Sequence, residues 1–287
     1  MSDALAKLRA LKSQAGSSKP LLKAPVSEHL GNPIEMLRRR MAQMSSHSSR
    51  ARSLHHDREL HGEEIADGLL LTDNYLNLDL DFPSVLDGTF DRSEGIAAED
   101  VVFFDTETTG LSGGTGTRAF MIGIAQYQRN GVGRFDLRVR QLLTTTLGAE
   151  REMLSTFAGW LTPSTVFCSY NGKSYDAPLL KTRYRLARMG NPFADLRHVD
   201  LLYPTRRQYK GVYENCRLCT IEDRVLRISR EDDLPGSEAP AAWLNYLRGG
   251  SAHNLRRVGE HNHQDVVTLS KLLLHLVEVQ GQSLYSR

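Results

Sequence analysis

The sequence has few cysteines and no long hydrophobic run. Only three of its 287 residues are cysteine, too few for a disulfide framework, which indicates a reducing, cytoplasmic compartment. No run approaches the roughly 20 apolar residues that a transmembrane helix needs, so we expect no membrane insertion. The N-terminal segment places Leu5, Leu8 and Leu11 at helical spacing, but it has neither the apolar region nor the cleavage site of a secretory signal.

The sequence also lacks a strong excess of charge and a complete zinc motif. Lys and Arg number 36 against 34 Asp and Glu, so the net charge of +2 neither indicates nor excludes a polyanionic partner. Cys216 and Cys219 form a single C-x-x-C pair with no second pair of ligands nearby. We interpret both cysteines as packing residues at helical spacing.

Three regions of the chain differ in composition. Residues 1–60 are mostly rich in Ser, Lys, Arg and His. They bury too little apolar surface to offset the entropy of folding, which predicts a flexible, largely disordered, basic and polar extension. Apolar residues return over 61–96, which predicts extended segments packed on the domain. We expect residues 97–280 to form the compact domain.

The predicted elements of the compact domain follow an α/β order. Three strands joined by tight turns come first, and alternating helices and strands follow. The strands are expected over 101–105, 119–128, 134–143, 165–170 and around Val199, and the helices over 150–161 and 177–189. The glycine-rich stretch 110–118 lacks the ending of a P-loop and precedes a strand. Hairpin geometry explains most of its glycines, and a loop approaching a sugar-phosphate is the alternative.

Two carboxylates end the first of these strands. Side chains alternate along a strand, so Asp105 and Glu107 share a face and can close on one divalent cation. Oxygen ligands of this kind suit Mg²⁺ or Mn²⁺, which hold phosphates during hydrolysis. The alternative is a pair of solvated carboxylates at a strand end.

Two further acids lie on predicted helices. One begins a helix, and the other lies on the inward face of a helix. Asp176 begins a helix after a strand, where a structural N-cap is the alternative to a catalytic role. His261 and Asp265 lie four residues apart, so they share one helix face, and leucines continue that face into the core. A hydrogen-bonded structural pair is the alternative for these two residues.

Taken in order, these blocks resemble the DEDD exonuclease superfamily of ribonuclease-H-like folds, and in detail the YprB-type ribonuclease-H-like domain proteins. The resemblance covers about residues 61–280. The blocks that carry it are 104–117, 170–176, 198–207, 216–222 and 261–265. The fold that it implies is a ribonuclease-H-like mixed sheet flanked by helices.

The resemblance implies a site of four acids that bind a pair of divalent cations, Mg²⁺ or Mn²⁺. The expected metal ligands are Asp105, Glu107, Asp176 and Asp265. The superfamily carries its general base either as a Tyr with three residues between it and the last Asp, or as a His with four. Here the first position holds His261 and the second holds Glu260. We therefore expect His261 to be the general base in an unusual register, with His263 as the alternative.

Residues around these blocks are expected to contact the substrate. The candidates near the acids are Thr108, Gly110, Asn171 and Lys173. Asp200 follows a short strand, and a structural hydrogen bond is the default for it, with an accessory role as the alternative.

A basic segment follows the third acid. Residues 181–210 contain eight Lys and Arg against two Asp, with tyrosines interleaved. Basic groups suit a phosphate backbone and aromatic rings suit unpaired bases, so we expect Arg206 and Arg207 to bind single strands or 3′ ends of nucleic acid. A solvated helix face is the alternative.

These observations favour a metal-dependent nuclease that hydrolyses phosphodiester bonds, with 3′–5′ exonuclease action by a two-metal mechanism. The second hypothesis is a nucleic-acid-binding module that keeps the fold but has little or no turnover. A third, a scaffolding protein that uses the N-terminal extension, depends only on the leucines of residues 1–12. The presence of all four acids favours the enzyme.

Overall fold

A computed structural model of the chain describes residues 57–110, 115–230 and 234–285. The chain divides after His55 into two units, and the described residues belong to the second. Most of the expected N-terminal extension, with its leucines, therefore lies outside the described residues. None of the described helices is long and apolar enough to cross a membrane.

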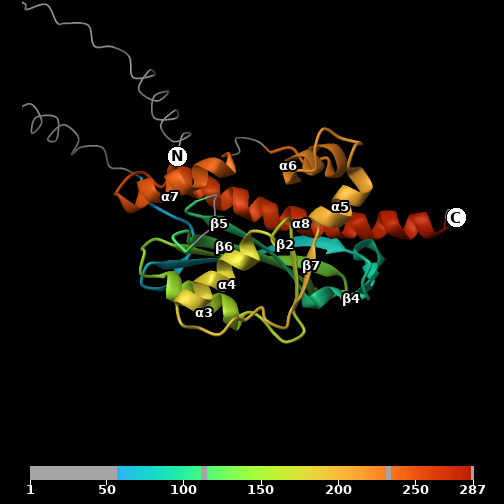
Figure 1. Cartoon of the computed structure of the whole chain (residues 1–287), viewed down its shortest axis with the longest axis horizontal. Coiled ribbons are helices and arrows are strands. Elements are labelled where there is room, and N and C mark those ends of the chain that lie inside the picture. The colour runs from blue at the N-terminus through green and yellow to red at the C-terminus, as the bar shows by residue number, and fades with distance from the viewer. Residues whose placement is uncertain (1–56, 111–114, 231–233, 286–287) are drawn as a thin grey trace, which may run out of the picture. The chain divides into compact units, whose positions relative to one another are not determined.

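A seven-stranded mixed sheet forms the centre of the domain (Figure 1). Its strand order is β1-β2-β7-β6-β5-β8-β9. The strands β1, β2, β7, β6 and β5 pair antiparallel, whereas β5, β8 and β9 pair parallel. Their bounds are β1 Glu63–Ala66, β2 Leu69–Leu80, β5 Val101–Thr108, β6 Ala119–Arg129, β7 Phe135–Thr144, β8 Val166–Ser169 and β9 Arg197–Asp200. The predicted mixed sheet is confirmed.

The first strand of the predicted core runs further than expected. The sequence predicted that it would end at Asp105, but β5 continues to Thr108 and stays paired with β6. Both acids of this strand are therefore held within the sheet. Residues 61–96 also do more than pack on the domain, because β2 pairs with β7 along most of its length and extends the sheet by two strands.

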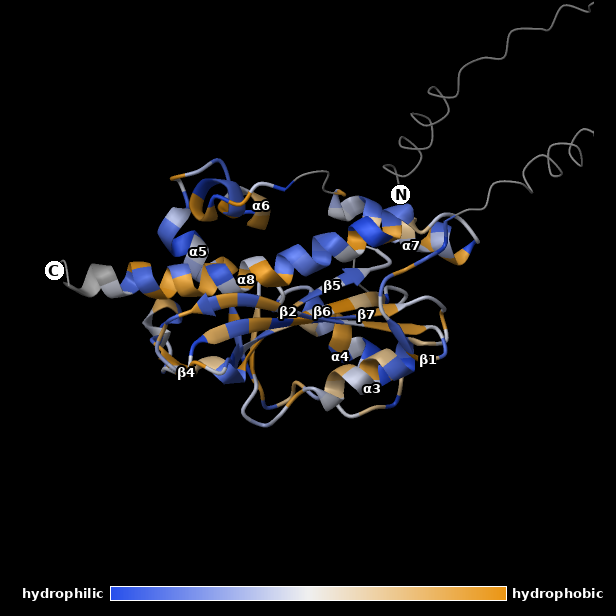
Figure 2. Ribbon diagram, turned by 180° about the vertical axis from the view of Figure 1, so that it is seen from behind, coloured by the Kyte–Doolittle hydropathy of each residue, from blue (hydrophilic) through white to orange (hydrophobic). Residues whose placement is uncertain are grey.

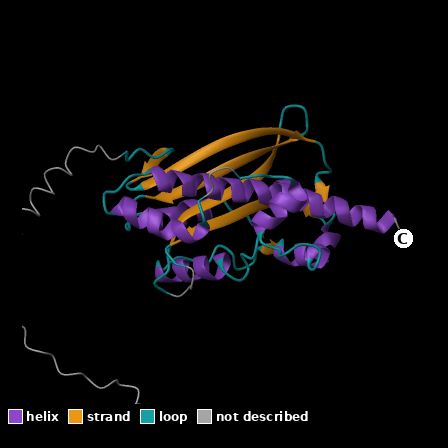
Figure 3. Ribbon diagram, turned by 90° about the horizontal axis from the view of Figure 1, so that it is seen from above, coloured by secondary structure: helices purple, strands orange, loops and turns teal. Residues whose placement is uncertain are grey.

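Helices cover both faces of the sheet (Figures 1 and 3). One face carries α7 (Ala239–Leu247) and the long helix α8 (His253–Tyr285), and the other carries α3 (Glu150–Gly159) and α4 (Asp176–Leu186). Alternation along β5 supplies both layers, since Val101 and Phe103 pack under α8 while Val102 and Phe104 pack against α3 and α4. Figure 2 shows the apolar stripe of α8 that faces the sheet.

Shorter elements connect the strands and helices. They are the helices α5 (Leu202–Tyr209) and α6 (Leu218–Ile221), the π-helical turn η4 (Glu222–Leu226) and the 3₁₀ turns η2 (Gly88–Asp91), η3 (Ala98–Asp100) and η5 (Gly236–Glu238). A two-stranded ribbon, β3 (Val85–Leu86) with β4 (Ile96–Ala97), completes the described part.

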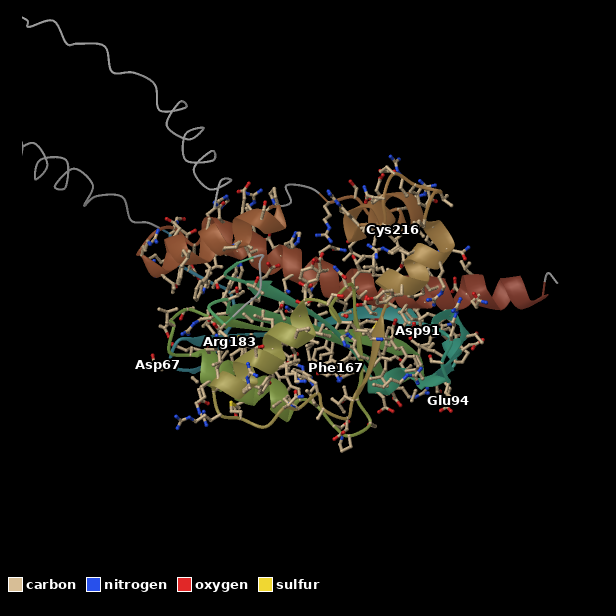
Figure 4. All side chains as sticks on the ribbon, viewed as in Figure 1. Asp67, Asp91, Glu94, Phe167, Arg183 and Cys216 are labelled. Carbon is tan, nitrogen blue, oxygen red and sulfur yellow. The ribbon has the colours of Figure 1, made fainter. Side chains whose placement is uncertain are left out.

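The packing interpretation of the C-x-x-C pair is wrong for one of its members. Cys216 is half-buried, and its carbonyl accepts a hydrogen bond from Tyr170 Oη at 2.6 Å (Figure 4). Cys219 is exposed, because α6 turns that side toward solvent. Neither cysteine is in a disulfide.

Residues 57–60 attach the start of the described chain to α7 and α8. The backbone N–H of Ala252 donates to the Asp57 carbonyl at 2.6 Å. Arg58 donates to the carbonyls of Tyr246 and Gly250 at 2.8 and 2.9 Å, and its guanidinium lies over the Tyr246 ring. Among the described residues, contacts with the domain are thus present up to four residues before the boundary that composition suggested.

These contacts predict a difference between two truncations. We expect a variant lacking residues 1–56 to melt cooperatively, and one lacking residues 1–60 to melt at a lower temperature, because the second loses the hydrogen bonds to the α7–α8 turn. In a domain of this size, each kcal/mol lost corresponds to about 2–4 °C. Calorimetry on the two proteins measures the difference. Equal melting temperatures would show that residues 57–60 add no stability.

Candidate active site

The two acids of β5 lie on the face of the sheet that α8 covers. Asp105 and Glu107 have the same parity as Val101 and Phe103, which pack against that helix. Glu107 is buried, with 7% of its surface exposed. Asp105 pairs across the sheet with Gly123 of β6.

A buried amide of α8 holds one oxygen of Asp105. Asn262 is fully buried, and its Nδ2 donates to Asp105 Oδ2 at 3.0 Å. Its Oδ1 accepts a hydrogen bond from Gln141 Nε2 of β7 at 2.9 Å. The amide fits only because Gly123 lies beneath it, since a Cβ at that position would come within 2.0 Å of Asn262 Oδ1. Three neighbouring elements therefore fix the orientation of this carboxylate.

Asp176 reaches the site from the start of α4. The helix begins at Asp176 with Tyr175 as the preceding cap residue, so the N-cap interpretation of Asp176 is wrong. Its carboxylate instead accepts a hydrogen bond from Thr106 Oγ1 on β5. Burial raises the pKa of Asp176 to about 6, although the Thr106 hydrogen bond acts in the opposite direction. In a fraction of the molecules, the Asp176 carboxyl is therefore protonated near neutral pH.

Asp265 and His261 lie on one face of α8, as their spacing predicts. Nε2 of His261 lies 3.7 Å from Oδ2 of Asp265. Arg230 approaches from the segment after η4, where its Nη2 donates to Asp265 Oδ1 and its Nη1 lies 3.1 Å from His261 Nδ1. The same guanidinium makes two 2.7 Å hydrogen bonds with the buried Glu222.

The acids are close enough to affect one another. Burial raises the pKa of Asp105 well above its usual value, and the charges of Asp265, Asp176 and Glu107 raise it further, while the Asn262 hydrogen bond lowers it. The structure therefore brings together all four acids that the sequence indicated.

Each of three carboxylates has one oxygen engaged by a protein donor. The pairs are Asp105 with Asn262, Asp176 with Thr106, and Asp265 with Arg230. In the described part of the chain, no three His, Cys, Asp or Glu side chains form a group that could hold a metal ion as they stand. The donor chemistry nevertheless fits a hard cation, because the groups that gather are carboxylate oxygens whose mutual repulsion a cation would relieve.

A cleft opens at the end of β5, between the two acids Asp105 and Asp176. Of the expected substrate-binding residues, Thr108, Gly110 and Asn171 line it. The remaining lining residues are Thr106, Thr117, Tyr170, Tyr175, Leu179 and Arg217. Tyr175 is 62% exposed and Arg217 is also exposed, so an aromatic ring and a guanidinium are accessible beside the acids.

Asp200 builds the loop that carries Asn171 and Lys173. Its buried carboxylate accepts the backbone N–H groups of Asn171 at 2.7 Å and Lys173 at 3.1 Å. Asn171 has a left-handed backbone with φ of 65°, and a Cβ on Gly172 would clash with Ser169 Oγ at 2.4 Å. The default interpretation of Asp200 as a structural residue is confirmed.

The side chain of Lys173 does not line the cleft. Its charge acts instead on Asp91, where it lowers a pKa that burial raises, and on His198, whose pKa burial and this charge lower to about 4. Lys173 is exposed at this end of the sheet.

The basic segment does not form one surface. Arg206 is exposed, and its charge acts on Tyr170, whose hydroxyl bonds the Cys216 carbonyl next to the cleft residue Arg217. Arg207 is also exposed, but its guanidinium donates to the Phe90 carbonyl. Arg183 is buried on the α3 side of the sheet, where it pairs with Glu150 at 2.5 Å (Figure 4). Tyr184 is buried with its hydroxyl on the Leu154 carbonyl, so it offers no stacking surface.

His263 lies away from the acids. It lines a separate hollow of about 900 Å³ together with residues of β2 and the first turns of α8. Burial lowers the pKa of His263. None of the four acids lines that hollow. The structure thus favours His261 over His263 as the histidine of the site.

Several residues of the site carried no role in the sequence analysis. They are Thr106, Gln141, Arg217, Glu222, Arg230 and Asn262. Asn262 and Glu222 stand inside the blocks that carried the family resemblance, which was a usable signal. Gln141 and Arg230 are isolated polar residues whose relevance appears only when the strands and α8 are placed.

The sequence is similar to that of a curated bacterial protein. The chain is 34% identical over 185 residues to the protein YprB of Bacillus subtilis (strain 168), which covers 64% of this chain and 43% of YprB. The chain therefore spans less than half the length of this curated relative.

Solved structures match part of the chain at low sequence identity and with TM-scores below 0.5. The family B DNA polymerase of the archaeon Pyrobaculum calidifontis matches with a TM-score of 0.44 and 15% identity, over 61% of this chain and 24% of the polymerase. Exonuclease I of E. coli in complex with single-stranded DNA matches with a TM-score of 0.36 and 14% identity, over 55% of this chain and 42% of the exonuclease.

The family itself follows from the sequence match. Residues 102–277, from the second residue of β5 into the second half of α8, match the RNase_H superfamily. This span contains the four acids, His261 and the sheet strands from β5 to β9. The chain therefore belongs to the RNase_H superfamily.

Proposed function

We propose that this protein is a metal-dependent nuclease that hydrolyses phosphodiester bonds in nucleic acid. The single observation that carries the proposal is the convergence of Asp265, Asp176 and Glu107 on the buried Asp105, whose pKa is raised by burial first and by these charges in addition. A buried cluster of acids is unfavourable without a compensating cation, so its presence at the end of β5 favours a site that binds metal.

Two divalent cations, Mg²⁺ or Mn²⁺, suit this donor set. Asp105, Glu107 and Asp265 would hold them, with Asp176 completing the site directly or through water. When bound, the cations activate water and stabilise the leaving 3′-oxygen. The protein's part is to keep the carboxylates in place, which Asn262 and Thr106 do through hydrogen bonds to Asp105 and Asp176.

The cleft suits a single strand or a frayed 3′ end. Tyr175 offers an exposed ring for a base, and Arg217 offers a guanidinium for a phosphate. Arg206 lies near Tyr170, whose hydroxyl bonds the carbonyl of Cys216, the residue before Arg217. This arrangement and the resemblance to DEDD enzymes support 3′–5′ exonuclease action. His261 is the residue expected to act on the attacking water.

An end-labelling assay tests the proposal. Single- and double-stranded DNA and RNA, labelled at the 5′ end, are incubated with the full chain and Mg²⁺ or Mn²⁺. A ladder of products shortened from the 3′ end is expected. Internal fragments would indicate endonuclease rather than exonuclease action. Binding without any cleavage would support the nucleic-acid-binding module instead.

Conservative changes to the β5 acids should separate cleavage from binding. We expect Asp105→Asn to lower kcat by about 10³-fold or more, because about 4 kcal/mol of transition-state stabilisation depends on the cations. We expect Glu107→Gln to lower kcat by a similar factor. Nucleic-acid affinity, measured by fluorescence anisotropy, should stay near that of the wild type, since the cleft contacts are unchanged. Wild-type turnover in either variant would contradict the metal-site assignment.

The pKa of Asp176 predicts how stability depends on pH without metal. Its folded value of about 6 lies above the usual 3.8, so the folded state binds more protons between these values and loses stability as pH rises from about 4 to 6. Asp176→Asn cannot ionise and can still accept the Thr106 hydrogen bond. In EDTA, we expect it to melt several degrees higher than the wild type at pH 8 and no higher at pH 4. An equal difference at both pH values would contradict a charge effect.

Charge reversal should locate the nucleic-acid surface. We expect Arg217→Glu and Arg206→Glu to weaken binding of all sequences alike, and each to reduce the slope of log K against log salt by about 1. Arg248→Glu is the matched control, because Arg248 is exposed after α7 and does not line the cleft. Titrations at several salt concentrations measure the slopes. Equal effects of all three changes would indicate bulk charge rather than a defined surface.

A further inference from the structure

Arg230 stands at the centre of the site although no motif includes it. Within the described part of the chain, its guanidinium contacts Glu222 through two hydrogen bonds of 2.7 Å, Asp265 through Nη2, and His261 through Nη1 at 3.1 Å. Asp265 is one of the candidate metal ligands, and His261 is the candidate base. Only 12% of the Arg230 side chain is exposed, so these contacts define its environment.

Glu222 fixes the direction from which Arg230 approaches. Its side chain is 1% exposed, and the carboxylate also accepts a hydrogen bond from Thr268 Oγ1 on α8. Thr268 Oγ1 in turn accepts from Gln264 Nε2 at 3.0 Å. A planar guanidinium that is held by two parallel hydrogen bonds has little freedom to turn, so its remaining donors point to fixed places.

These fixed donors determine which nitrogen of His261 carries the proton. Arg offers only N–H donors, so the contact between Nη1 and Nδ1 requires a lone pair on Nδ1. The proton of the neutral ring is then on Nε2, the nitrogen that lies 3.7 Å from Asp265 Oδ2. Asp265 Oδ1 accepts from the same guanidinium, so the ring and the carboxylate are held by one residue.

We propose that Arg230, clamped by Glu222, is a positioning residue that fixes His261 as the tautomer with its proton on Nε2 and orients Asp265 beside it. In this state His261 presents an N–H donor, rather than a lone pair, on the side of Asp265 Oδ2. It donates to a phosphate oxygen or to the water at that place. To accept a proton there as a general base, His261 would need Arg230 to release Nδ1.

The tautomer is measured without any assumption about activity. Selective ¹⁵N-histidine labelling of the full chain and long-range ¹H–¹⁵N correlation spectra distinguish a protonated from an unprotonated ring nitrogen, and His261→Gln identifies the signals. In the wild type, we expect unprotonated Nδ1 and protonated Nε2. Arg230→Gln and Glu222→Gln should both shift the ring toward a mixture of tautomers. A wild-type ring with its proton on Nδ1, or an unchanged ring in Arg230→Gln, would overturn the proposal.

Two further variants separate geometry from charge and from general damage. Arg230→Lys keeps a positive charge but cannot form the two parallel hydrogen bonds to Glu222, so it should resemble Arg230→Gln. Arg230→Lys also provides the test if Arg230→Gln does not fold. Arg224→Gln is the matched control, because Arg224 lies in η4 with Glu222 but pairs with the exposed Glu214. It should leave the His261 signals unchanged, and a shift equal to that of Arg230→Gln would show a non-specific effect.

The role of Arg230 in turnover depends on the proposed nuclease function, and the spectra do not. We expect Arg230→Gln to lower kcat by about 10²-fold with KM near the wild-type value, as misplacement of reacting groups does. If the wild type cleaves nothing but the tautomer shifts as expected, the nuclease proposal fails and the positioning role stands. If the wild type cleaves and Arg230→Gln turns over at the same rate, the positioning role in catalysis is wrong.

Discussion

The repulsion between acids gathered at the end of β5 is the constraint on which this site depends. Burial and three neighbouring charges raise the pKa of Asp105, so the folded chain must compensate for the cluster locally. It does so with one donor for each of three acids: Asn262 for Asp105, Thr106 for Asp176 and Arg230 for Asp265. These buried polar contacts would serve no purpose in a site without the acids.

The parts of the site that follow from local periodicity could be predicted from the sequence. Alternation along a strand places Asp105 and Glu107 on one face, and spacing along a helix places His261 with Asp265. The α/β class and the mixed sheet also followed, because tight turns and alternating elements restrict the topology. The family resemblance added Asp176, whose local context alone suggested a helix cap.

The remaining parts depend on register and on contacts between distant segments. Gln141 and Gly123 matter only because β6 and β7 place them beneath Asn262, and no pattern near them indicates this. The charge run at Arg206 and Arg207 suggested one surface, but consecutive residues of a helix point about 100° apart. Both residues are exposed, but the Arg207 guanidinium turns to the Phe90 carbonyl. Composition likewise predicted extended segments over 61–96 but not their pairing with β7.

The contact between Asn262 and Gly123 has a consequence for synthesis of the chain. The β5 acids are made roughly 160 residues before Asp265, which at ordinary translation rates is an interval of about 10–30 s. Throughout that interval, β5 has neither the amide that orients Asp105 nor the carboxylate of α8. The sheet can form first, but the complete set of acids exists only after α8 docks over Gly123. A growing chain beside its own messenger RNA therefore cannot assemble this site before most of the domain has been made.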